Sequence, residues 1–343
     1  MADLTNSLAA RGHDLYAVLR PHSPLISHLK LNAEKIKTLP LRNSLDVPSA
    51  HELARFVARH EIEVVHAHMA RDYTLAAYAA RRNRKAKFIV TRHVLFQLSR
   101  LHRHTLARAR RVIAVSNAVA RELRAQRIVS DAQLAVVTNG VDVDRFNVDF
   151  DRNQFLQSLG LRTSGLLVGS IGELRTLKRH DDFIRAVAMI APQFPDAHFV
   201  LAGLDTSLSR EVHKHLEELV IETRLQERFH FLGWVEDAEK LLGSIDVFVS
   251  ASETESFGLA IAEAMAAGKP VVATATEGAR EVVAEEVGLL VPIGDVARIA
   301  HSVATLLSDK ARRTQMGARA REVVAQKFSL ERMVDQIEQI YRD

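Results

Sequence analysis

The stretch that decides the fold is Ser250-Ala-Ser-Glu-Thr-Glu-Ser-Phe-Gly-Leu-Ala-Ile-Ala-Glu-Ala-Met-Ala-Ala-Gly-Lys-Pro-Val-Val272. It follows the apolar run 245–249, which is typical of a buried strand, and it opens a helix whose first turn holds Phe257, Gly258 and Leu259. A strand that passes through a short loop into a helix is typical of an α/β domain. A helix N-terminus with a small residue in its first turn offers backbone N–H groups to an anion.

Two acidic residues bracket this helix N-terminus. Glu255 lies just before the first turn, and Glu263 follows eight residues later. Eight residues at the helical rise span about 12 Å, which is close to the distance from a hexose, past a diphosphate, to a ribose. Carboxylates are good acceptors for sugar hydroxyls. The spacing therefore predicts a site for a sugar nucleotide.

Length and composition set the broad class of the protein. With 343 residues the chain exceeds the usual size of one core, so two domains are expected. A composition of 47% hydrophobic and 26% charged residues is ordinary for a globular protein. The absence of cysteine excludes disulfides and thiolate metal sites, and it fits a reducing compartment. No run of about 18 apolar residues occurs, so no transmembrane helix is expected.

Apolar runs alternate with helical patterns along the chain, which favours parallel sheets wrapped by helices. The predicted strands are 15–19, 64–67, 88–91, 112–115, 134–137, 166–171, 198–202, 229–232, 247–250, 271–275 and 289–291. The pattern restarts near residue 165, after a polar segment at 149–164 that suits a linker. We therefore expect a first domain over 1–160, a second over 161–326, and a C-terminal helix over 327–343 that packs back toward the first domain.

Charge is distributed unevenly between the two halves. Residues 1–150 hold 24 Lys and Arg against 13 Asp and Glu, whereas residues 151–343 hold 22 against 29. The basic excess concentrates in 81–87 and 100–111. It is interpreted either as solvated helix surface or as a contact with an anionic membrane surface or acceptor. No nucleic-acid-binding motif accompanies the charge, so no nucleic acid partner is expected.

Several motifs together resemble one known family. They are Glu255-x7-Glu263 with Gly268-Lys-Pro-Val-Val272, Val64-Val-His-Ala-His68, Val112-Ile-Ala-Val-Ser116 and Thr138-Asn-Gly-Val-Asp142. This set resembles the family-4 retaining glycosyltransferases. The resemblance implies the GT-B fold, an α/β architecture of two Rossmann-like domains with parallel sheets facing across a cleft. It also implies that a nucleotide-sugar donor binds mainly to the second domain and an acceptor to the first.

The resemblance assigns roles to residues of the second domain. Glu255 is expected to contact the hexose hydroxyls and Glu263 the ribose. Phe257, Gly258 and Leu259 are expected to supply backbone N–H groups near the sugar and the diphosphate. The family has an Arg and a Lys that meet the charge of the leaving diphosphate. Lys178 matches that Lys, but the Arg position holds Glu173, so Arg175 is the candidate substitute.

Histidines and one acidic pair complete the candidate residues. His93 follows a predicted strand and is expected, by resemblance, to act near the transferred sugar and phosphate, where an imidazole can donate a hydrogen bond. His66 and His68 lie two residues apart on one strand face, and structural or acceptor-lining roles are favoured over a metal site. Asp142-Val-Asp144 follows a turn signal, so a turn or capping role is favoured. No metal and no cofactor are expected.

The start of the chain departs from the family pattern. Family members begin with a strand and a Gly-rich turn before the first helix, whereas this chain opens inside that helix, which is predicted to end at Gly12. An incomplete first sheet and acceptor side are therefore expected of this polypeptide.

The predicted activity is retaining transfer of a hexose from a UDP- or GDP-sugar to a cell-envelope glycan or glycolipid. The predicted location is cytoplasmic, either free or peripheral at the inner face of the cytoplasmic membrane. The alternatives are a truncated nucleotide-sugar-binding module without turnover and a GT-B sugar-nucleotide epimerase. A classical dehydrogenase is disfavoured because no Gly-x-Gly-x-x-Gly follows any predicted strand.

Overall fold

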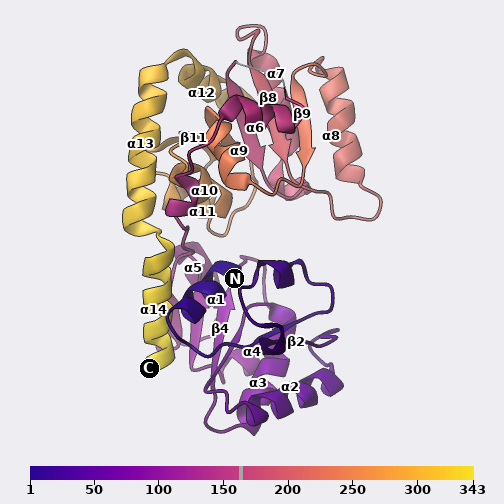
Figure 1. Ribbon diagram of the computed structural model, residues 1–343, viewed down its shortest axis with the longest axis vertical. Coiled ribbons are helices and arrows are strands. Elements are labelled where there is room, and N and C mark those ends of the chain that lie inside the picture. Colours follow the sequence, from indigo (N-terminus) through magenta and orange to yellow (C-terminus); the bar gives the residue numbers. More distant parts are fainter. Residues whose placement is uncertain (162–164) are drawn as a thin grey trace. The chain divides into compact units, whose positions relative to one another are not determined.

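The computed structural model describes residues 1–161 and 165–343 and divides into two compact units (Figure 1). The first unit comprises residues 1–140 together with 330–343, and the second comprises residues 141–329. Both are α/β units with parallel strands. The chain thus visits the first unit twice, because its last helix returns to it.

The second unit is built on a parallel sheet with the strand order β12-β11-β10-β7-β8-β9. Its strands are short runs rich in Val, Phe and Leu. Strands β10 and β11 are buried along their whole length and β7 along all but its last residue, as expected of a parallel sheet covered on both faces. Each of the predicted strands of this half is found within one residue of its expected ends. The strands are β7 (Leu167–Ile171), β8 (His198–Ala202), β9 (Phe229–Gly233), β10 (Val247–Ser250), β11 (Val271–Thr274) and β12 (Gly288–Val291).

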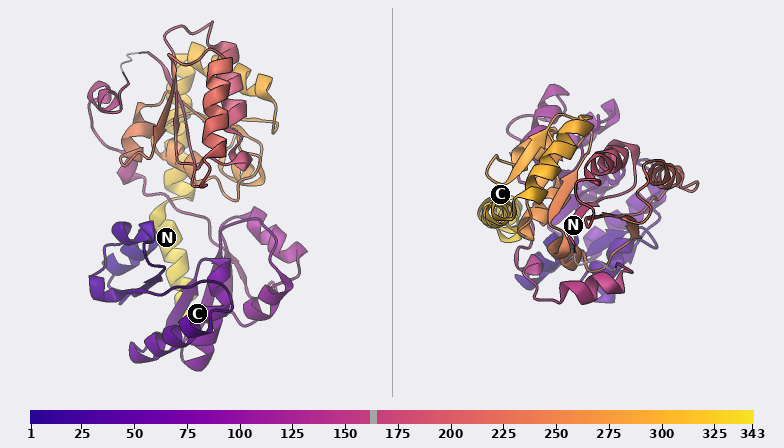
Figure 2. Two further views of the ribbon diagram at one scale, coloured as in Figure 1. Left: turned by 90° about the vertical axis from the view of Figure 1, so that its right-hand side faces the viewer. Right: turned by 90° about the horizontal axis from the view of Figure 1, so that it is seen from above.

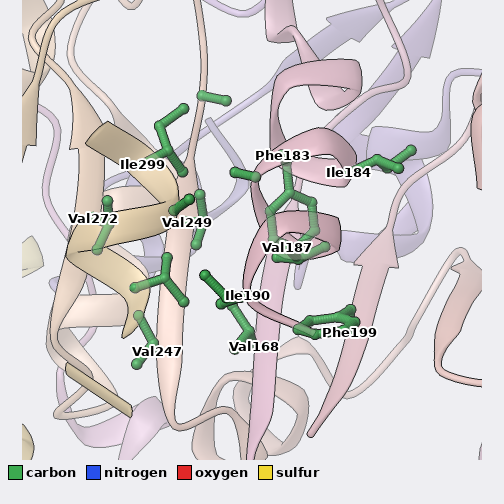
Figure 3. Close-up of a cluster of buried hydrophobic side chains, with 14 of the residues drawn as sticks. Val168, Phe183, Ile184, Val187, Ile190, Phe199, Val247, Val249, Val272 and Ile299 are labelled. Atoms are coloured by element: carbon green, nitrogen blue, oxygen red, sulfur yellow. The ribbon is translucent and has the colours of Figure 1, made fainter. Parts of the chain in front are cut away.

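Helices cover this sheet and close its core (Figures 1 and 2). The main core joins Val168 and Phe199 of the strands to Phe183 and Val187 of one helix and Ile299 of another (Figure 3). Aspartate or threonine side chains cap α6, α11, α12 and α13. The helices are α6 (Arg152–Ser158), α7 (His180–Ile190), α8 (Glu211–Glu222), α9 (Ala238–Ser244), α10 (Leu259–Ala266), α11 (Glu277–Val282), α12 (Val296–Ser308) and α13 (Lys310–Lys327), with short 3₁₀ turns η4 (Asp144–Phe146) and η5 (Thr176–Lys178).

Most of the segment expected to link the domains is folded into the second unit. Helix α6 lies within it, and its Leu156 is fully buried. Arg152 Nε donates to the carbonyl of Ser244 at the end of α9 over 3.0 Å. These contacts place α6 in the second unit, which comprises residues 141–329. Residues 162–164 of the expected linker lie outside the described residues.

The first unit contains a four-stranded parallel sheet with the order β3-β4-β5-β6 and a separate two-stranded parallel sheet, β1-β2. Strand β2 was not predicted, because its three residues, Ile-Lys-Thr, carry too little apolar pattern. The strands are β1 (Ala17–Leu19), β2 (Ile36–Thr38), β3 (Val64–Ala67), β4 (Lys87–Arg92), β5 (Arg111–Ala114) and β6 (Leu134–Val136).

The helices of the first unit include both ends of the described chain. They are α1 (Ala2–Ala10), α2 (Val47–Arg59), α3 (Tyr73–Arg82), α4 (Arg100–Leu106), α5 (Asn117–Ala125) and α14 (Leu330–Arg342), with 3₁₀ turns η1 (Pro24–His28), η2 (Ala33–Lys35) and η3 (Ala70–Asp72). After α1 the chain turns at Gly12, whose φ of +90° is the left-handed conformation that glycine adopts readily.

The last helix, α14, docks through its apolar face. Val334 and Ile337 are buried in one cluster with Leu8 of α1 and with Ile89 of β4, and Figure 1 shows α14 beside both elements. An ion pair of 2.6 Å between Arg11 and Asp335 adds to this contact. Within residues 1–161 and 165–343, no helix has both the length and the apolar character that a bilayer span requires.

Candidate functional site

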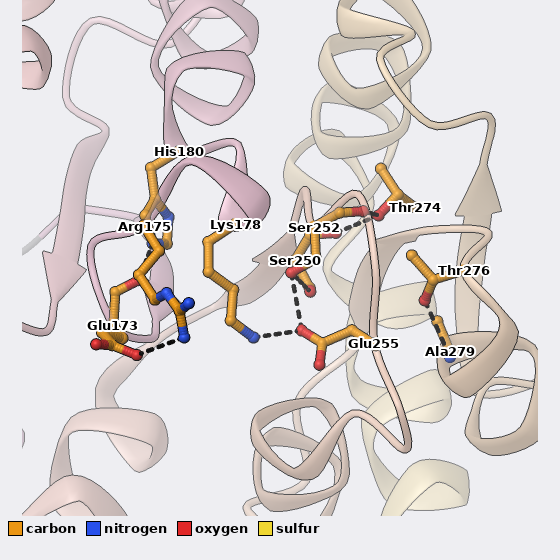
Figure 4. A network of polar contacts seen from close by, with 10 residues as sticks. All are labelled: Glu173, Arg175, Lys178, His180, Ser250, Ser252, Glu255, Thr274, Thr276 and Ala279. Atoms are coloured by element: carbon orange, nitrogen blue, oxygen red, sulfur yellow. Dashed lines mark hydrogen bonds and ion pairs between the residues drawn. The ribbon is translucent and has the colours of Figure 1, made fainter. Parts of the chain in front are cut away.

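The candidate site lies at the carboxyl ends of two neighbouring strands of the second unit. In the order β12-β11-β10-β7-β8-β9, sequence numbering reverses between β10 and β7. Ligands of open α/β sheets bind outside the carboxyl ends of the strands at such a reversal. The loop after β7 carries Glu173, Arg175 and Lys178, and the loop after β10 carries Glu255 (Figure 4).

A lysine and a carboxylate meet across these two loops. Lys178 Nζ donates to Glu255 Oε1 over 2.6 Å, and the hydroxyl of Ser252 donates to the same oxygen over 2.8 Å. The side chains remain partly accessible, with 29% of Lys178 and 15% of Glu255 exposed. Figure 4 shows both charged ends pointing toward each other from opposite sides. The pair is therefore positioned to meet a ligand that carries both anionic and hydroxyl groups.

The loop after β10 leads directly into the N-terminus of α10. Gly258 takes the left-handed conformation, with φ at +91°, and provides no side chain to cap the helix. Phe257 is 2% exposed and packs its ring edge-on against Phe328, with ring centroids 5.5 Å apart. The buried ring anchors the loop, and Leu259 begins the helix whose first N–H groups face an anion favourably. Glu263 lies on the same helix and is half-buried.

A glycine from the next strand–helix connection supports this loop, and sequence reasoning missed it. Gly278, in α11, donates its N–H to the carbonyl of Glu255 over 3.0 Å. A Cβ at position 278 would lie 2.6 Å from Glu255 O and 2.7 Å from Phe257 N. Thr274, at the end of β11, donates to the carbonyl of Ser252. Their position could have indicated this role, because Thr274 ends β11 and Gly278 follows that strand at the same sheet edge.

The candidate substitute for the family arginine is paired with the acid at the family position. Arg175 Nη1 lies 3.5 Å from Glu173 Oε2, and the Arg175 side chain is 57% exposed. The hydroxyl of Thr206 donates to Glu173 over 2.8 Å, which holds that carboxylate at the loop. The buried ring of His180 lies 3.2 Å from the Glu173 carbonyl, and burial lowers the pKa of His180 to about 4. A neutral imidazole that donates to this carbonyl fixes the start of the loop.

The histidine candidates belong to the first unit. Nδ1 of His68 lies 3.1 Å from Nε2 of His93, and the two ring planes are inclined by 29° with centroids 5.4 Å apart. The ring of His66 lies 4.2 Å from that of His68, so the predicted sharing of one strand face is confirmed. His66 contacts the hydroxyls of Tyr341 and Thr91 at 2.6 and 2.7 Å. The structure thus brings His93 together with His66 and His68.

Burial keeps these imidazoles neutral. It lowers the pKa of His66 to about 3 and that of His93 to about 4, and it lowers the pKa of His68 well below the ordinary value of 6.5. A neutral imidazole carries one N–H donor and one lone pair. The cluster is therefore suited to directional hydrogen bonding and not to carrying charge.

Lowering the pH is expected to destabilise the protein through these histidines. The unfolded chain takes up protons below the ordinary pKa of about 6.5, whereas the buried imidazoles do not, so protons favour unfolding. The stabilisation is fully present above that value. It is lost as the pH falls toward about 4 for His93 and about 3 for His66. One pKa unit corresponds to about 1.4 kcal/mol, so the change for His93 alone is at most about 3 kcal/mol.

Urea denaturation at several pH values between 7.5 and 4.5 measures this dependence. His93→Gln should give a shallower fall of the unfolding free energy with decreasing pH than the wild type. His104→Gln, at an exposed histidine, should leave the slope unchanged. Equal slopes for the wild type and His93→Gln would contradict the buried neutral state.

Acidic residues in the turn before the second unit's core do not form a metal cluster. Asp142 accepts a hydrogen bond from the N–H of Arg145 over 3.3 Å, and Asp144 begins the turn η4. In the described parts of the chain, no group of three or more His, Asp or Glu side chains is arranged to hold a metal ion.

Comparison with known proteins places both units in described families. Residues 151–323 match Glycosyl transferases group 1, and residues 1–145 match Glycosyltransferase Family 4. One relative is the N-acetyl-alpha-D-glucosaminyl L-malate synthase of Bacillus anthracis, 28% identical over 99% of this chain and 92% of its own length. Another is the lipopolysaccharide core biosynthesis mannosyltransferase LpsB of Rhizobium meliloti, 29% identical over 72% of this chain and 71% of its own length.

Among solved structures, Anabaena HepE in complex with UDP and glucose matches with a TM-score of 0.86. It is 23% identical, and the match covers 98% of this chain and 93% of HepE. A likeness at this identity concerns the fold, and it confirms the predicted α/β architecture with parallel sheets.

Proposed function

Because the chain belongs to the group 1 glycosyltransferases, we propose that it transfers a hexose, with retention of the anomeric configuration, from a nucleoside-diphosphate sugar to a glycan or glycolipid acceptor. The observation that carries this proposal is the Lys178–Glu255 contact of 2.6 Å at the strand-order reversal, beside the N-terminus of α10. A cation and a helix N-terminus suit a diphosphate, and a carboxylate suits sugar hydroxyls. The described complex of HepE with UDP and glucose supports the same donor class.

Different residues contact different parts of the donor in this proposal. When a diphosphate binds, Lys178 leaves Glu255 and moves to the diphosphate oxygens. The carboxylate of Glu255 can then accept hydrogen bonds from the hexose hydroxyls. The N-terminal turn of α10 faces the phosphate side, and Glu263, further along that helix, accepts from the ribose. Arg175 turns from Glu173 to the diphosphate, since its exposed side chain has room to move.

In the proposed reaction the bond between the anomeric carbon and the diphosphate oxygen breaks. The acceptor hydroxyl forms the new bond to that carbon on the same face, and its proton passes to the departing diphosphate. Lys178 and the helix N-terminus stabilise the negative charge that develops on the leaving group. His93, whose neutral ring carries one N–H donor, is proposed to donate it to an oxygen of a bound substrate. No protein nucleophile is required.

A donor assay tests this proposal against its alternatives. The purified chain is incubated with UDP- and GDP-hexoses, with and without lipopolysaccharide core and polyprenyl-diphosphate-sugar acceptors, and products are analysed by mass spectrometry. Transfer with an unchanged anomeric configuration supports the proposal. An epimerised nucleotide sugar formed from donor alone favours an epimerase. Nucleotide binding by calorimetry without hydrolysis or transfer favours a binding module, and inverted products would contradict retention.

We propose that the transfer needs no metal ion, because the cationic role at the diphosphate is filled by Lys178 and the helix N-terminus. Activity is therefore expected to be the same after dialysis against EDTA and after addition of Mg²⁺ or Mn²⁺. The measurement is the initial rate at saturating donor. A loss of about tenfold or more in EDTA that Mn²⁺ restores would show that a metal takes part.

We propose that the first unit attaches to anionic membrane at the inner face of the cytoplasmic membrane. The residues that carry this are exposed and basic, at the end of α3 and in the following turn: Arg81, Arg82, Arg84 and Lys85. Nearby Lys87 is half-buried and its Nζ donates to the carbonyl of Tyr341 at the end of α14 over 2.9 Å, so we leave it out of the exposed set. Basic residues near an anionic bilayer contribute about 1 kcal/mol each.

Vesicle co-sedimentation measures this attachment. Binding to phosphatidylglycerol vesicles should weaken at least about tenfold when all four residues are changed to Gln, and it should fall with added salt. Changing Lys310 and Arg312, exposed basic residues of α13, to Gln is the control. Equal binding to neutral and anionic vesicles would show that the four residues are solvated surface only.

A further inference from the structure

In the first unit a hydrogen bond joins His93, a candidate site residue, to His68, for which no role in binding or catalysis has been argued so far. His68 lies just after β3 and His93 just after β4, and these neighbouring strands are paired in parallel. The contact joins Nδ1 of His68 to Nε2 of His93 over 3.1 Å. It therefore occupies one of the two ring nitrogens of His93 and leaves only Nδ1 for a ligand.

The surroundings of His68 hold its ring in place. The ring lies between those of His66 and His93, with centroid distances of 4.2 and 5.4 Å. His66 is itself fixed at both nitrogens by the hydroxyls of Tyr341 and Thr91. The close packing of His66 on the His68 ring and the contact with His93 together set the direction of Nδ1 of His68.

One proton lies between the two nitrogens, and its position decides what His93 can offer. If His68 donates from Nδ1, His93 accepts at Nε2 and carries its own proton on Nδ1, so it is a donor toward a ligand. If His93 donates from Nε2, its Nδ1 is a lone pair and can only accept. A phosphate oxygen is an acceptor, so only the first arrangement lets His93 bind one.

We propose that His68 is a positioning residue that donates its Nδ1–H to Nε2 of His93 and thereby holds His93 in the Nδ1–H tautomer, ready to donate to a phosphate or sugar oxygen. The choice of this tautomer and its catalytic consequence rest on the proposed function, whereas the contact between the two rings is given by the structure. The contact at Nε2 of His93 thus decides whether Nδ1 carries a proton. In the same way, a hydrogen bond at one ring nitrogen of a metal-bound or catalytic histidine fixes the protonation of the other.

The tautomer is measured directly by nitrogen-15 NMR of the full chain labelled at its histidine rings. His93 is assigned by the loss of its signals in His93→Gln. In the wild type at pH 7 without substrate, Nδ1 of His93 should be protonated and Nε2 unprotonated. Protonation of Nε2 instead would overturn the proposal, and this measurement does not depend on transferase activity.

Two matched variants at position 68 test the donor role. His68→Asn keeps an N–H donor close to the position of Nδ1 and should preserve both the tautomer and most of kcat. His68→Asp offers only an acceptor, so His93 should switch to the Nε2–H tautomer. A catalytic histidine in the wrong tautomer is a severe defect, and we expect kcat to fall about 10²-fold while the KM for the donor changes less than threefold.

The outcomes separate this inference from the proposed function. If the tautomer is as expected but no variant or wild type transfers sugar, the proposed function fails and the positioning contact stands. If the wild type is active and His68→Asp is folded and equally active, or keeps the Nδ1–H tautomer, the positioning role is wrong. Circular dichroism and thermal unfolding identify a variant that fails to fold, in which case the wild-type tautomer and His68→Asn decide.

Discussion

Replacement of Glu255 by Gln is expected to lower kcat/KM for hexosyl transfer by about 10²–10³-fold while the fold remains intact. The amide keeps an oxygen that can accept from Ser252, but it removes the negative charge that lies 2.6 Å from Lys178. The charge of Lys178 then has no anionic partner at Glu255 before the donor binds, and the hexose loses a charged acceptor for its hydroxyls. Preorganised electrostatic groups of this kind contribute about 10²–10³-fold each. Glu255→Ala removes the acceptor as well, so it should abolish transfer.

The control is the same change two residues earlier in the loop. Glu253 is 53% exposed and lies 3.7 Å from Arg179, outside the Lys178 contact. Glu253→Gln should change kcat/KM less than threefold. The measurements are initial rates over a range of donor concentrations, with thermal unfolding of each variant. Wild-type turnover by a folded Glu255→Gln would remove Glu255 from its assigned role.

The strands and the central stretch could be predicted from the sequence because their signals are local. The apolar run before Ser250 and the small first turn around Gly258 indicate a strand, a loop and a helix without any other part of the chain. Strand β2 and helix α6 gave no such signal. Strand β2 is only three residues long, and α6 depends on Arg152, whose partner Ser244 lies far along the chain.

Contacts between distant segments could not be predicted from patterns alone. The Lys178–Glu255 contact needs β7 beside β10, a pairing of Val168 with Val247 that no local pattern encodes. The resemblance to a known family supplied the two residues, but not their direct contact. It also did not indicate that Arg175 pairs with Glu173 or that His68 contacts His93. Side-chain partners follow from packing, and packing is fixed only by the complete fold.

Gly278→Ala is expected to damage both stability and transfer, although residue 278 carries no reactive group. Its Cβ would lie 2.6 Å from the carbonyl oxygen of Glu255 and 2.7 Å from the nitrogen of Phe257. Both are backbone atoms of the loop, so no flexible side chain can move aside. Either α11 or the loop must shift, and the hydrogen bond from Gly278 N to Glu255 O must lengthen. Overpacking of this kind costs about 1–3 kcal/mol.

Gly278→Ala is also expected to slow transfer, because the displaced loop is the one that holds Glu255. It carries Glu255 and ends at the N-terminus of α10, so one methyl group moves the carboxylate and the helix N–H groups relative to Lys178. A misplacement of about 1 Å can cost about 10²-fold in rate, and we expect kcat/KM to fall by that factor. Gly172→Ala is the control for stability, because its Cβ meets only side-chain atoms 3.8 Å or more away. Urea unfolding and donor-saturation kinetics measure both effects, and wild-type values for Gly278→Ala in both would show that the loop adapts without cost.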